Sequence, residues 1–455
     1  MDNKPIPKRN IAFFPFFLIL CLVLGGITTP GCRDREVRDG IYMEAAREAA
    51  RWIQSTSMEI ESGGRIWPAV PGDKASVGTT LYSGVPGTVL FFLELYTATK
   101  DIVFLQEAQT GADFLLSRLD EEKMYGLYVG ISGIGYALQE TFKTSREQKY
   151  HDGFLRCLDL LKENSQQDEN GIHWGPVTDL ISGNTGIGLF LIYASDELGE
   201  STWLDLAAQV GQQLLFQGLD TETGTQWAMS AEFPRHYPNF SHGTAGTAYF
   251  LASLYLKTGT ESFLEAAVRG AQYLLNVAES GEEGEVCLIF HHEPGGEDLY
   301  YLGWCHGPVG TARLFFRLYE ITQDEIWMNW LEKGANAILE SGIPEIQTTG
   351  FWNNLGVCCG SAGVADFFLS LYNLTQKERY LSFAKILTEK ILSKRTQNKE
   401  GVYWIHAEHR SQPELLLAQT GLMQGAAGIG LWLLHLDAHD KGLKRLIVLP
   451  DNPFR

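Results

Sequence analysis

Three cysteines in the second half of the chain have the residue type and arrangement that suit metal chemistry. Cys305 stands alone, whereas Cys358 and Cys359 are adjacent in the sequence. A vicinal pair seldom closes a disulfide, because its geometry is strained. Zinc favours thiolates in a tetrahedral arrangement, and three protein ligands leave the fourth position to water or substrate. We therefore predict a zinc site on these three cysteines, in preference to three buried apolar thiols.

A repeated motif indicates how distant residues meet. A Gly-x-x-Gly element followed by an apolar stretch occurs seven times, and the spacing between repeats is long enough for two helices and their loops. The first glycines of the motifs are Gly84, Gly130, Gly183, Gly243, Gly307, Gly360 and Gly425. Apolar residues on all sides after each motif predict buried helices, and segments between motifs, such as 104–119 and 263–277, are amphipathic.

This pattern predicts an all-α fold, an α/α toroid (a double helical barrel) of seven helical hairpin repeats. Inner and outer helices should alternate in one domain over residues 40–445. Equivalent positions of consecutive repeats are neighbours in such a ring, and helix starts with glycines converge on one central mouth. The residues at the motif starts are His242 in repeat four, Cys305 and His306 in repeat five, and Cys358 and Cys359 in repeat six.

The segments WCHGPVG at 304–310 and CCGSAG at 358–363 resemble the two zinc-ligand motifs of the lanthionine synthetase C-like family. HGTAG, which begins at His242, resembles a third family motif, and the resemblance extends over all seven repeats. The usual ligands of this family are Cys, Cys and His, and here Cys359 stands where the His is usual. Some members have three thiolates, so the resemblance implies bound Zn²⁺.

The chemistry implied by the resemblance is the addition of a thiol to dehydroalanine or dehydrobutyrine, which forms a thioether. The substrate would be a dehydrated peptide that is cyclised or a small thiol that is conjugated, and the enzyme a C–S bond-forming lyase. Zinc would lower the pKa of the substrate thiol, and proton transfer needs an acid and a base. By resemblance His242 and Asp179 are the catalytic candidates, with their two roles unassigned. Asp179 alone equally suits a helix cap, and His306 is a candidate pocket residue or a support for the adjacent ligand.

Two other functions compete with this interpretation. Several cyclases of the family carry an Arg shortly before the first zinc Cys, and residues 298–303 offer none. That departure favours a non-catalytic surface protein that retains zinc to bind thiols or peptides. A sugar-processing toroid would instead need a carboxylate pair among Asp179, Glu232 and Glu408, and would leave the three cysteines without a role.

The N-terminus and the charge predict the location and exclude one class of partner. Basic residues precede an apolar run over residues 11–24, which predicts a signal peptide over residues 1–32. Residues 29–32 resemble a bacterial lipoprotein cleavage box with Cys32 as the lipid acceptor. We therefore expect a membrane-associated, extracytoplasmic protein held by a lipid or by the signal segment. A net charge of -19, without a basic tract beyond the N-terminus, excludes nucleic acid as a partner.

Overall fold

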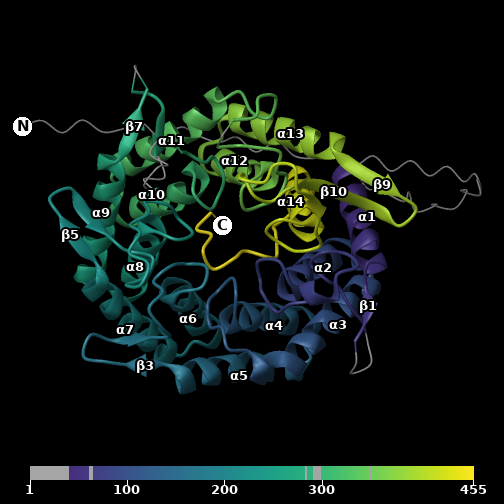
Figure 1. Ribbon diagram of the computed structural model, residues 1–455, viewed down its shortest axis with the longest axis horizontal. Helices are drawn as coiled ribbons and strands as arrows, with labels where there is room; N and C mark the ends of the chain where they lie inside the picture. The colour runs from purple at the N-terminus through teal and green to yellow at the C-terminus, as the bar shows by residue number, and fades with distance from the viewer. Residues whose placement is uncertain (1–39, 61–64, 282–283, 290–298, 349, 455) are drawn as a thin grey trace, which may run out of the picture. The chain divides into compact units, whose positions relative to one another are not determined.

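The helices of the computed structural model alternate between an inner and an outer ring (Figure 1). The structure describes residues 40–60, 65–281, 284–289, 299–348 and 350–454. The inner helices are α2 (Val85–Thr99), α4 (Ile131–Ser145), α6 (Asn184–Leu198), α8 (Thr244–Thr258), α10 (Pro308–Thr322), α12 (Ser361–Thr375) and α14 (Ala426–Asp440). The outer helices are α1 (Ile41–Ser55), α3 (Ile102–Arg118), α5 (Gln148–Asn164), α7 (Ser201–Gln217), α9 (Glu261–Asn276), α11 (Glu325–Glu340) and α13 (Glu378–Ser393). This arrangement confirms the predicted all-α toroid.

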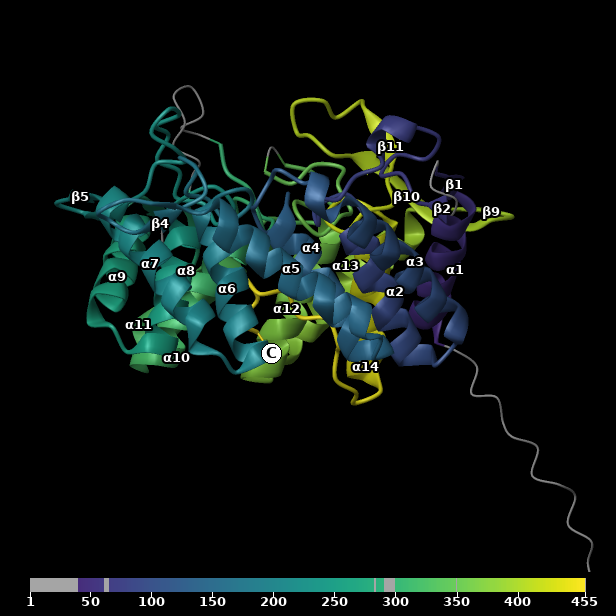
Figure 2. The same cartoon turned by 90° about the horizontal axis from the view of Figure 1, so that it is seen from below.

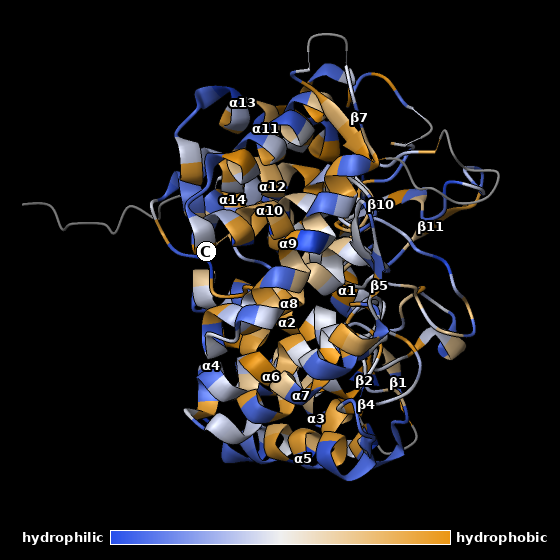
Figure 3. Cartoon of the chain, turned by 90° about the vertical axis from the view of Figure 1, so that its left-hand side faces the viewer, coloured by the Kyte–Doolittle hydropathy of each residue, from blue (hydrophilic) through white to orange (hydrophobic). Residues whose placement is uncertain are grey.

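The two rings differ in burial, as their sequence patterns predict. In α2 every residue from Val85 to Leu95 is buried, because this helix is enclosed on all sides. In the outer helix α9 the buried residues recur at steps of three and four, as with Phe263, Ala267 and Gly270. Hydrophilic residues mark the outward surfaces of α5, α7 and α9 in Figure 3. The hydrophobic core therefore lies between the rings and inside the inner one.

The first helix closes the ring. Each of the helices α2 to α13 forms a sequential hairpin with its neighbour, whereas α14 has α1, from the other end of the fold, as its outer partner. Helix α1 also packs on strand β10 (Gly401–Ala407), where Trp52 stacks on Tyr403 with ring centroids 4.9 Å apart. The seventh hairpin is thus completed by a contact between residues far apart in the sequence.

Short β-hairpins follow most outer helices and lie on the face where the inner helices begin (Figure 2). All pairings between the described strands are antiparallel. The pairs are β1 (Met58–Glu59) with β2 (Arg65–Ile66), β3 (Gln166–Gln167) with β4 (Ile172–His173), β5 (Leu219–Thr221) with β6 (Gly224–Gln226), and β7 (Ala278–Ser280) with β8 (Cys287–Ile289). A three-stranded sheet combines β9 (Arg395–Asn398), β10 and β11 (Leu416–Ala418), and two short 3₁₀ helices cover Lys74–Ser76 and Leu119–Glu121.

A closed ring of backbone hydrogen bonds joins the seven loops that precede the inner helices. In each bond an amide of one loop donates to a carbonyl of the next, over 2.9 to 3.3 Å. The donors and acceptors are Tyr82 to Tyr128, Tyr128 to Ile181, Leu180 to Ser241, Ser241 to Cys305, Cys305 to Cys358, Cys358 to Met423, and Met423 back to Tyr82. Equivalent positions of consecutive repeats are therefore held one hydrogen bond apart.

The second glycine of each motif lets the loop fold back over its helix. At Gly428 a Cβ atom would overlap the carbonyl oxygen of Leu422, and at Gly310 it would overlap that of Trp304. Only a residue without a Cβ leaves room for these carbonyls at their present positions. The motif glycines therefore shape the loops that carry the candidate site residues.

The N-terminal interpretation concerns residues that the structure does not describe. The predicted signal peptide over residues 1–32 and its Cys32 lie outside the described residues, and this interpretation stays a prediction. Within the part of the chain that is described, no helix has both the length and the apolar character needed to cross a bilayer.

We predict that Gly428→Ala destabilises the fold, because its Cβ would displace the carbonyl of Leu422. The free energy of unfolding should fall by about 1–3 kcal/mol, as is typical when a packed interior is overfilled. Gly78→Ala is the matched control, since a Cβ at Gly78 meets nothing within 4 Å. Urea unfolding of both variants measures the difference, and equal midpoints would contradict this account of the motif.

Candidate metal centre

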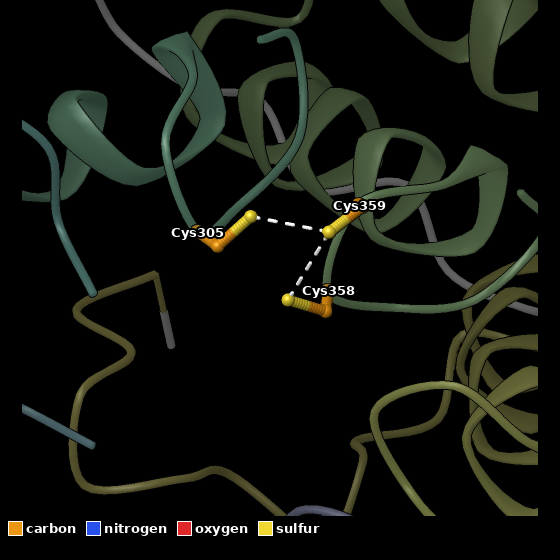
Figure 4. A group of neighbouring side chains, drawn as sticks. All are labelled: Cys305, Cys358 and Cys359. Atoms are coloured by element: carbon orange, nitrogen blue, oxygen red, sulfur yellow. Dashed lines mark hydrogen bonds between the residues drawn. The ribbon is translucent and has the colours of Figure 1, made fainter. Parts of the chain in front are cut away.

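The structure brings the side chains of the three predicted cysteines together (Figure 4), and all three line one cavity. Cys305 lies in the loop before α10, and Cys358 and Cys359 lie in the loop before α12. The sulfur of Cys305 is 3.2 Å from that of Cys359, which is 3.4 Å from that of Cys358. All three sulfurs lie within 4.8 Å of one another. The backbone bond from Cys305 to Cys358 fixes this meeting, because it joins the two loops directly.

This cluster fits a tetrahedral thiophilic metal ion. Zn–S bonds of about 2.3 Å place sulfurs about 3.8 Å apart at tetrahedral angles, close to the separations found here. Cys305 and Cys358 are 5% and 3% exposed, so the ligand atoms are shielded from solvent on the protein side. Within the described residues, no other group of three or more Cys, His, Asp or Glu side chains converges in this way.

The cluster lowers the pKa of one of its three thiols even without a metal. Burial raises the pKa of the Cys358 thiol, but hydrogen bonds from the two neighbouring thiols and from Tyr82 outweigh it. The pKa of Cys358 therefore lies well below its ordinary value. Hydrogen bonding to Cys358 raises the pKa of Cys305, and hydrogen bonds to both other cysteines raise that of Cys359. A bound cation would replace the protons that the cluster now shares.

His242 and Asp179 form a hydrogen-bonded pair beside the sulfurs. The Nδ1 atom of His242 lies 2.6 Å from Oδ2 of Asp179, which is fully buried. The other carboxylate oxygen of Asp179 accepts hydrogen bonds from the amides of Ser182 and Gly183, at 2.8 and 3.0 Å. Asp179 thus holds the turn before α6 and also orients His242, and its catalytic role stays a prediction.

The environment of His242 raises its pKa and so makes the imidazole a stronger base. Burial opposes the charge, but the hydrogen bond and the negative charge of Asp179 outweigh burial, and the pKa of His242 is raised. Cys358 adds to this effect in the metal-free protein. Because Asp179 accepts from Nδ1, we assign the proton of the neutral ring to that atom. Nε2 is then the atom left for proton exchange.

The cavity above the sulfurs has a volume of about 450 Å³ and is lined by His242 and His306. The ring of His306 lies 4.8 Å from that of Tyr301 and 5.8 Å from that of His242. His306 is therefore part of the cavity wall, and its contact with a substrate stays a prediction. Val129, His242, His306, Cys359 and Gln424 all line the cavity, and each directly precedes the first glycine of its motif.

The position directly before the first glycine of a motif identifies one further site residue, Gln424, which was not predicted from the sequence. Gln424 donates a hydrogen bond of 2.9 Å to the hydroxyl of Tyr82 and accepts one of 2.9 Å from Asn354. Its Nε2 atom is also 4.0 Å from the sulfur of Cys359. Gln424 therefore links the Tyr82 hydroxyl to the cluster, and its position before Gly425 was the available signal.

Arg410 was also missed, and no repeat signal points to it. It lies in the connection from β10 to β11, which contributes residues 408–411 to the cavity lining. Its side chain hydrogen-bonds to Tyr301. Among the described residues that line this cavity, Arg410 is the one lysine or arginine. The connection therefore supplies a cation that the segment before Cys305 lacks.

The carboxylates considered for sugar chemistry are not gathered at this mouth. Glu408 lines the cavity and accepts a hydrogen bond of 2.8 Å from Gln419. Asp179 is committed to His242 and to its own turn, and Glu232 is exposed outside the cavity lining. Among the described lining residues, Glu408 is the one acid, whereas glycoside hydrolysis uses two.

Comparison with known proteins decides the family. A sequence model of one protein family, described as lanthionine synthetase C-like protein, matches residues 75–447 of this chain. The chain belongs to the lanthionine synthetase C-like family. A curated relative, glutathione S-transferase LANCL1 of Danio rerio, is 22% identical over 309 residues, which are 66% of this chain and 72% of the relative.

Solved structures share the toroid of this lanthionine synthetase C-like chain. Nisin cyclase superposes with a TM-score of 0.62 at 16% identity, over 87% of this chain and 93% of the cyclase. The Lin0763 protein of Listeria innocua superposes with a TM-score of 0.52 at 14% identity, over 88% and 97% of the two chains. At these identities the likeness shows the fold alone.

We predict that Asp179→Asn lowers the pKa of His242. Asn removes the negative charge that stabilises the imidazolium, while burial continues to favour the neutral ring. NMR titration of ¹³C-labelled histidines in the metal-free protein should show the His242 midpoint at lower pH than in the wild type. His151 in α5, far from the site in the repeat order, serves as the internal reference. An unchanged His242 midpoint would show that Asp179 acts only as a cap.

Proposed function

We propose that this protein uses a zinc ion on Cys305, Cys358 and Cys359 to add a thiol to dehydroalanine or dehydrobutyrine residues. The observation that carries the proposal is the meeting of three thiols and the His242–Asp179 pair at one cavity. Membership in the lanthionine synthetase C-like family supports it, as does the fold shared with nisin cyclase.

The metal would supply Lewis acidity that lowers the pKa of a substrate thiol and holds it as a thiolate at neutral pH. Three thiolate ligands would make the site strongly negative, so the substrate sulfur would stay a weakly held and reactive nucleophile. The chain itself keeps this sulfur in place by enclosing it in the cavity. Tyr82 and Gln424 donate hydrogen bonds next to the ligand sulfurs and help to carry the negative charge.

His242 is the proposed proton carrier. The substrate sulfur forms a bond to Cβ of the dehydroamino acid, and the electron pair of the C=C bond moves toward Cα and its carbonyl. The thiol proton passes to Nε2 of His242 and then to Cα, so that the thioether forms without a net change in protons. Asp179 holds the ring by Nδ1 and stabilises the imidazolium between the two transfers. His306 lines the same wall and would contact the bound substrate.

The cavity favours a small thiol that carries a carboxylate. Its volume of about 450 Å³ is in the range of small-molecule sites, and Arg410 offers a guanidinium at its wall. The relative named glutathione S-transferase LANCL1 suggests glutathione as a thiol of this kind. A cysteine of a dehydrated peptide is the second thiol that the same chemistry accepts, and cyclisation would follow if both partners belong to one peptide.

The location of the protein is a separate proposal. The pattern of residues 1–32 supports export, with Cys32 as a lipid-bearing anchor at the outer face of a bacterial membrane. An exported site would meet dehydrated peptides after their release. Should the protein bind zinc and yet fail to add thiols, the surface binding protein considered from the sequence would replace the enzyme.

We predict about one zinc per chain in residues 33–455, measured by elemental analysis after gel filtration. Cys358→Ala should lose the metal, because two thiolates cannot hold zinc tightly at this site. Cys157→Ala is the matched control, since Cys157 is a buried thiol of α5 outside the cluster. A folded wild-type protein without zinc would overturn the proposal.

We further predict that His242→Gln lowers kcat for addition of glutathione to a dehydroalanine peptide by about 10²–10⁴, the usual range for a general acid–base. The zinc content should stay unchanged, because His242 is not a proposed ligand. Mass spectrometry of the thioether product gives the rate. A variant that keeps full kcat would remove His242 from the mechanism.

Arg410→Gln provides a comparison that separates binding from chemistry in the same assay. It should raise the KM for glutathione about tenfold or more, as loss of a charge-assisted hydrogen bond implies, with kcat nearly unchanged. With 2-mercaptoethanol, which has no carboxylate, the variant and the wild type should have the same KM. A fall in kcat with both thiols would place Arg410 in the chemistry instead.

A further inference from the structure

The last described segment, residues 444–454, enters the centre of the inner ring (Figure 1). It has no helix or strand, yet Ile447, Asp451 and Phe454 are 1%, 0% and 5% exposed. An irregular segment is stable in such a place only if its polar groups find partners. The contacts of this segment, here called the central tail, show where those partners lie.

Inner helices from several repeats hold the central tail. Glu94 of α2 accepts hydrogen bonds from the amides of Leu446 and Ile447, at 3.0 and 2.7 Å. The hydroxyl of Tyr136 in α4 donates to the carbonyl of Val448 over 2.9 Å. At the far end, the ring of Phe454 packs 5.0 Å from Phe316 of α10 and 6.0 Å from Phe367 of α12.

Asp451 connects the central tail to the loop of a proposed zinc ligand. One carboxylate oxygen accepts a hydrogen bond of 3.0 Å from Nε1 of Trp304, the residue directly before Cys305. The same oxygen accepts a bond of 3.0 Å from Arg313 of α10, and the other oxygen accepts one of 3.1 Å from the hydroxyl of Tyr128. Arg313 also donates to the backbone carbonyl of Asp451 at 2.9 Å.

Trp304 is the wall between the central tail and the candidate metal centre. Its side chain lines the cavity above the sulfurs and is 2% exposed, while its indole nitrogen points to Asp451. Its ring lies 5.1 Å from Tyr128 and 6.0 Å from Phe240, in the loops of repeats two and four. A shift of Trp304 would therefore move the backbone of Cys305.

We infer that the central tail is a positioning element for the metal centre, with Asp451 as the residue that fixes the Cys305 loop through Trp304. The buried carboxylate satisfies three side-chain donors that belong to two different repeats. Without it, the indole N–H and the Arg313 guanidinium would be buried without this acceptor. The loop would then relax, and the sulfur of Cys305 would leave the position that the other two sulfurs require.

Of the proposed function, this inference requires only that the metal is bound. Its test therefore measures metal binding and the position of the Cys305 thiol. Zinc affinity is measured by competition with a chelator, and the Co²⁺-substituted protein is followed by its thiolate charge-transfer and ligand-field absorption. Asp451→Asn and Trp304→Phe should each weaken zinc binding about tenfold, the lower range for groups that support metal ligands. Both should change the cobalt spectrum, and the double variant should lose less than the product of the two effects, because both substitutions weaken the same Trp304–Asp451 link.

Glu140→Gln is the matched control, because Glu140 is a buried carboxylate of an inner helix whose partners are Lys143 and Tyr193. It should lower the unfolding temperature and leave zinc affinity and the cobalt spectrum as in the wild type. The inference is overturned if Asp451→Asn and Trp304→Phe behave like this control. Trp304→Phe keeps the Asp451–Arg313 ion pair, so it still tests the link if Asp451→Asn does not fold.

A metal-free measurement separates this inference from the proposed function. Alkylation of Cys305 by iodoacetamide, followed by peptide mass spectrometry, reports the position of the thiol without any metal. Asp451→Asn should speed alkylation of Cys305 severalfold over the wild type, while Cys157 reacts as before. If the wild type binds no metal, the proposed function fails, and the alkylation rates still decide the role of Asp451: equal rates overturn it.

Discussion

The closed ring of backbone hydrogen bonds between loops is the constraint on which this structure depends. A toroid of seven hairpins needs no particular order at its helix starts, but these seven bonds leave each loop one acceptable position. They bring Cys305 and Cys358 together although a whole repeat separates them in the sequence. The glycines of the motif follow from the same constraint, because a Cβ at the second glycine would push the loop carbonyls away. The chemistry of the site therefore depends on main-chain geometry, and the side chains occupy places that the ring has set.

Much of the fold could be predicted because two independent features of the sequence mark each repeat. These are the spacing of the glycines and the periodicity of the apolar residues. The glycine motif located all seven inner helices, and its register placed the cysteines and His242 at one mouth. The closing helix α1 carries no such motif, and its pairing with α14 is a contact between the two ends of the fold. The short hairpins after the outer helices are polar and brief, so neither their composition nor a period of two marked them as strands.

The site residues that could be predicted are mainly those that stand at or next to the position directly before the first glycine of a motif. Gln424 also stands directly before its motif glycine, but glutamine is neither a usual zinc ligand nor a proton carrier, so its residue type gave no signal. Beside thiolates it acts as a hydrogen-bond donor. Arg410 lies in a connection between strands that has no counterpart in the described parts of the other repeats, and only the folded chain shows that it reaches the cavity. The central tail has no periodicity at all, and its partners come from helices throughout the ring.

The distribution of charge explains why the site combines these parts. Three thiolate ligands would place negative charge in a buried setting, which is costly unless cations or donors compensate it. The proposed metal ion would supply most of that compensation, the Tyr82 hydroxyl and Gln424 add donors, and His242 lies within electrostatic reach of Cys358. Asp179 in turn stabilises His242, but its second oxygen is saturated by backbone amides, so its charge is shared with the start of α6. Asp451 would add a further anion if Arg313 did not neutralise it, and the side chain of Arg313 is only 12% exposed. The two buried carboxylates around the site are therefore each paired with a basic side chain from another element, Asp179 with His242 and Asp451 with Arg313.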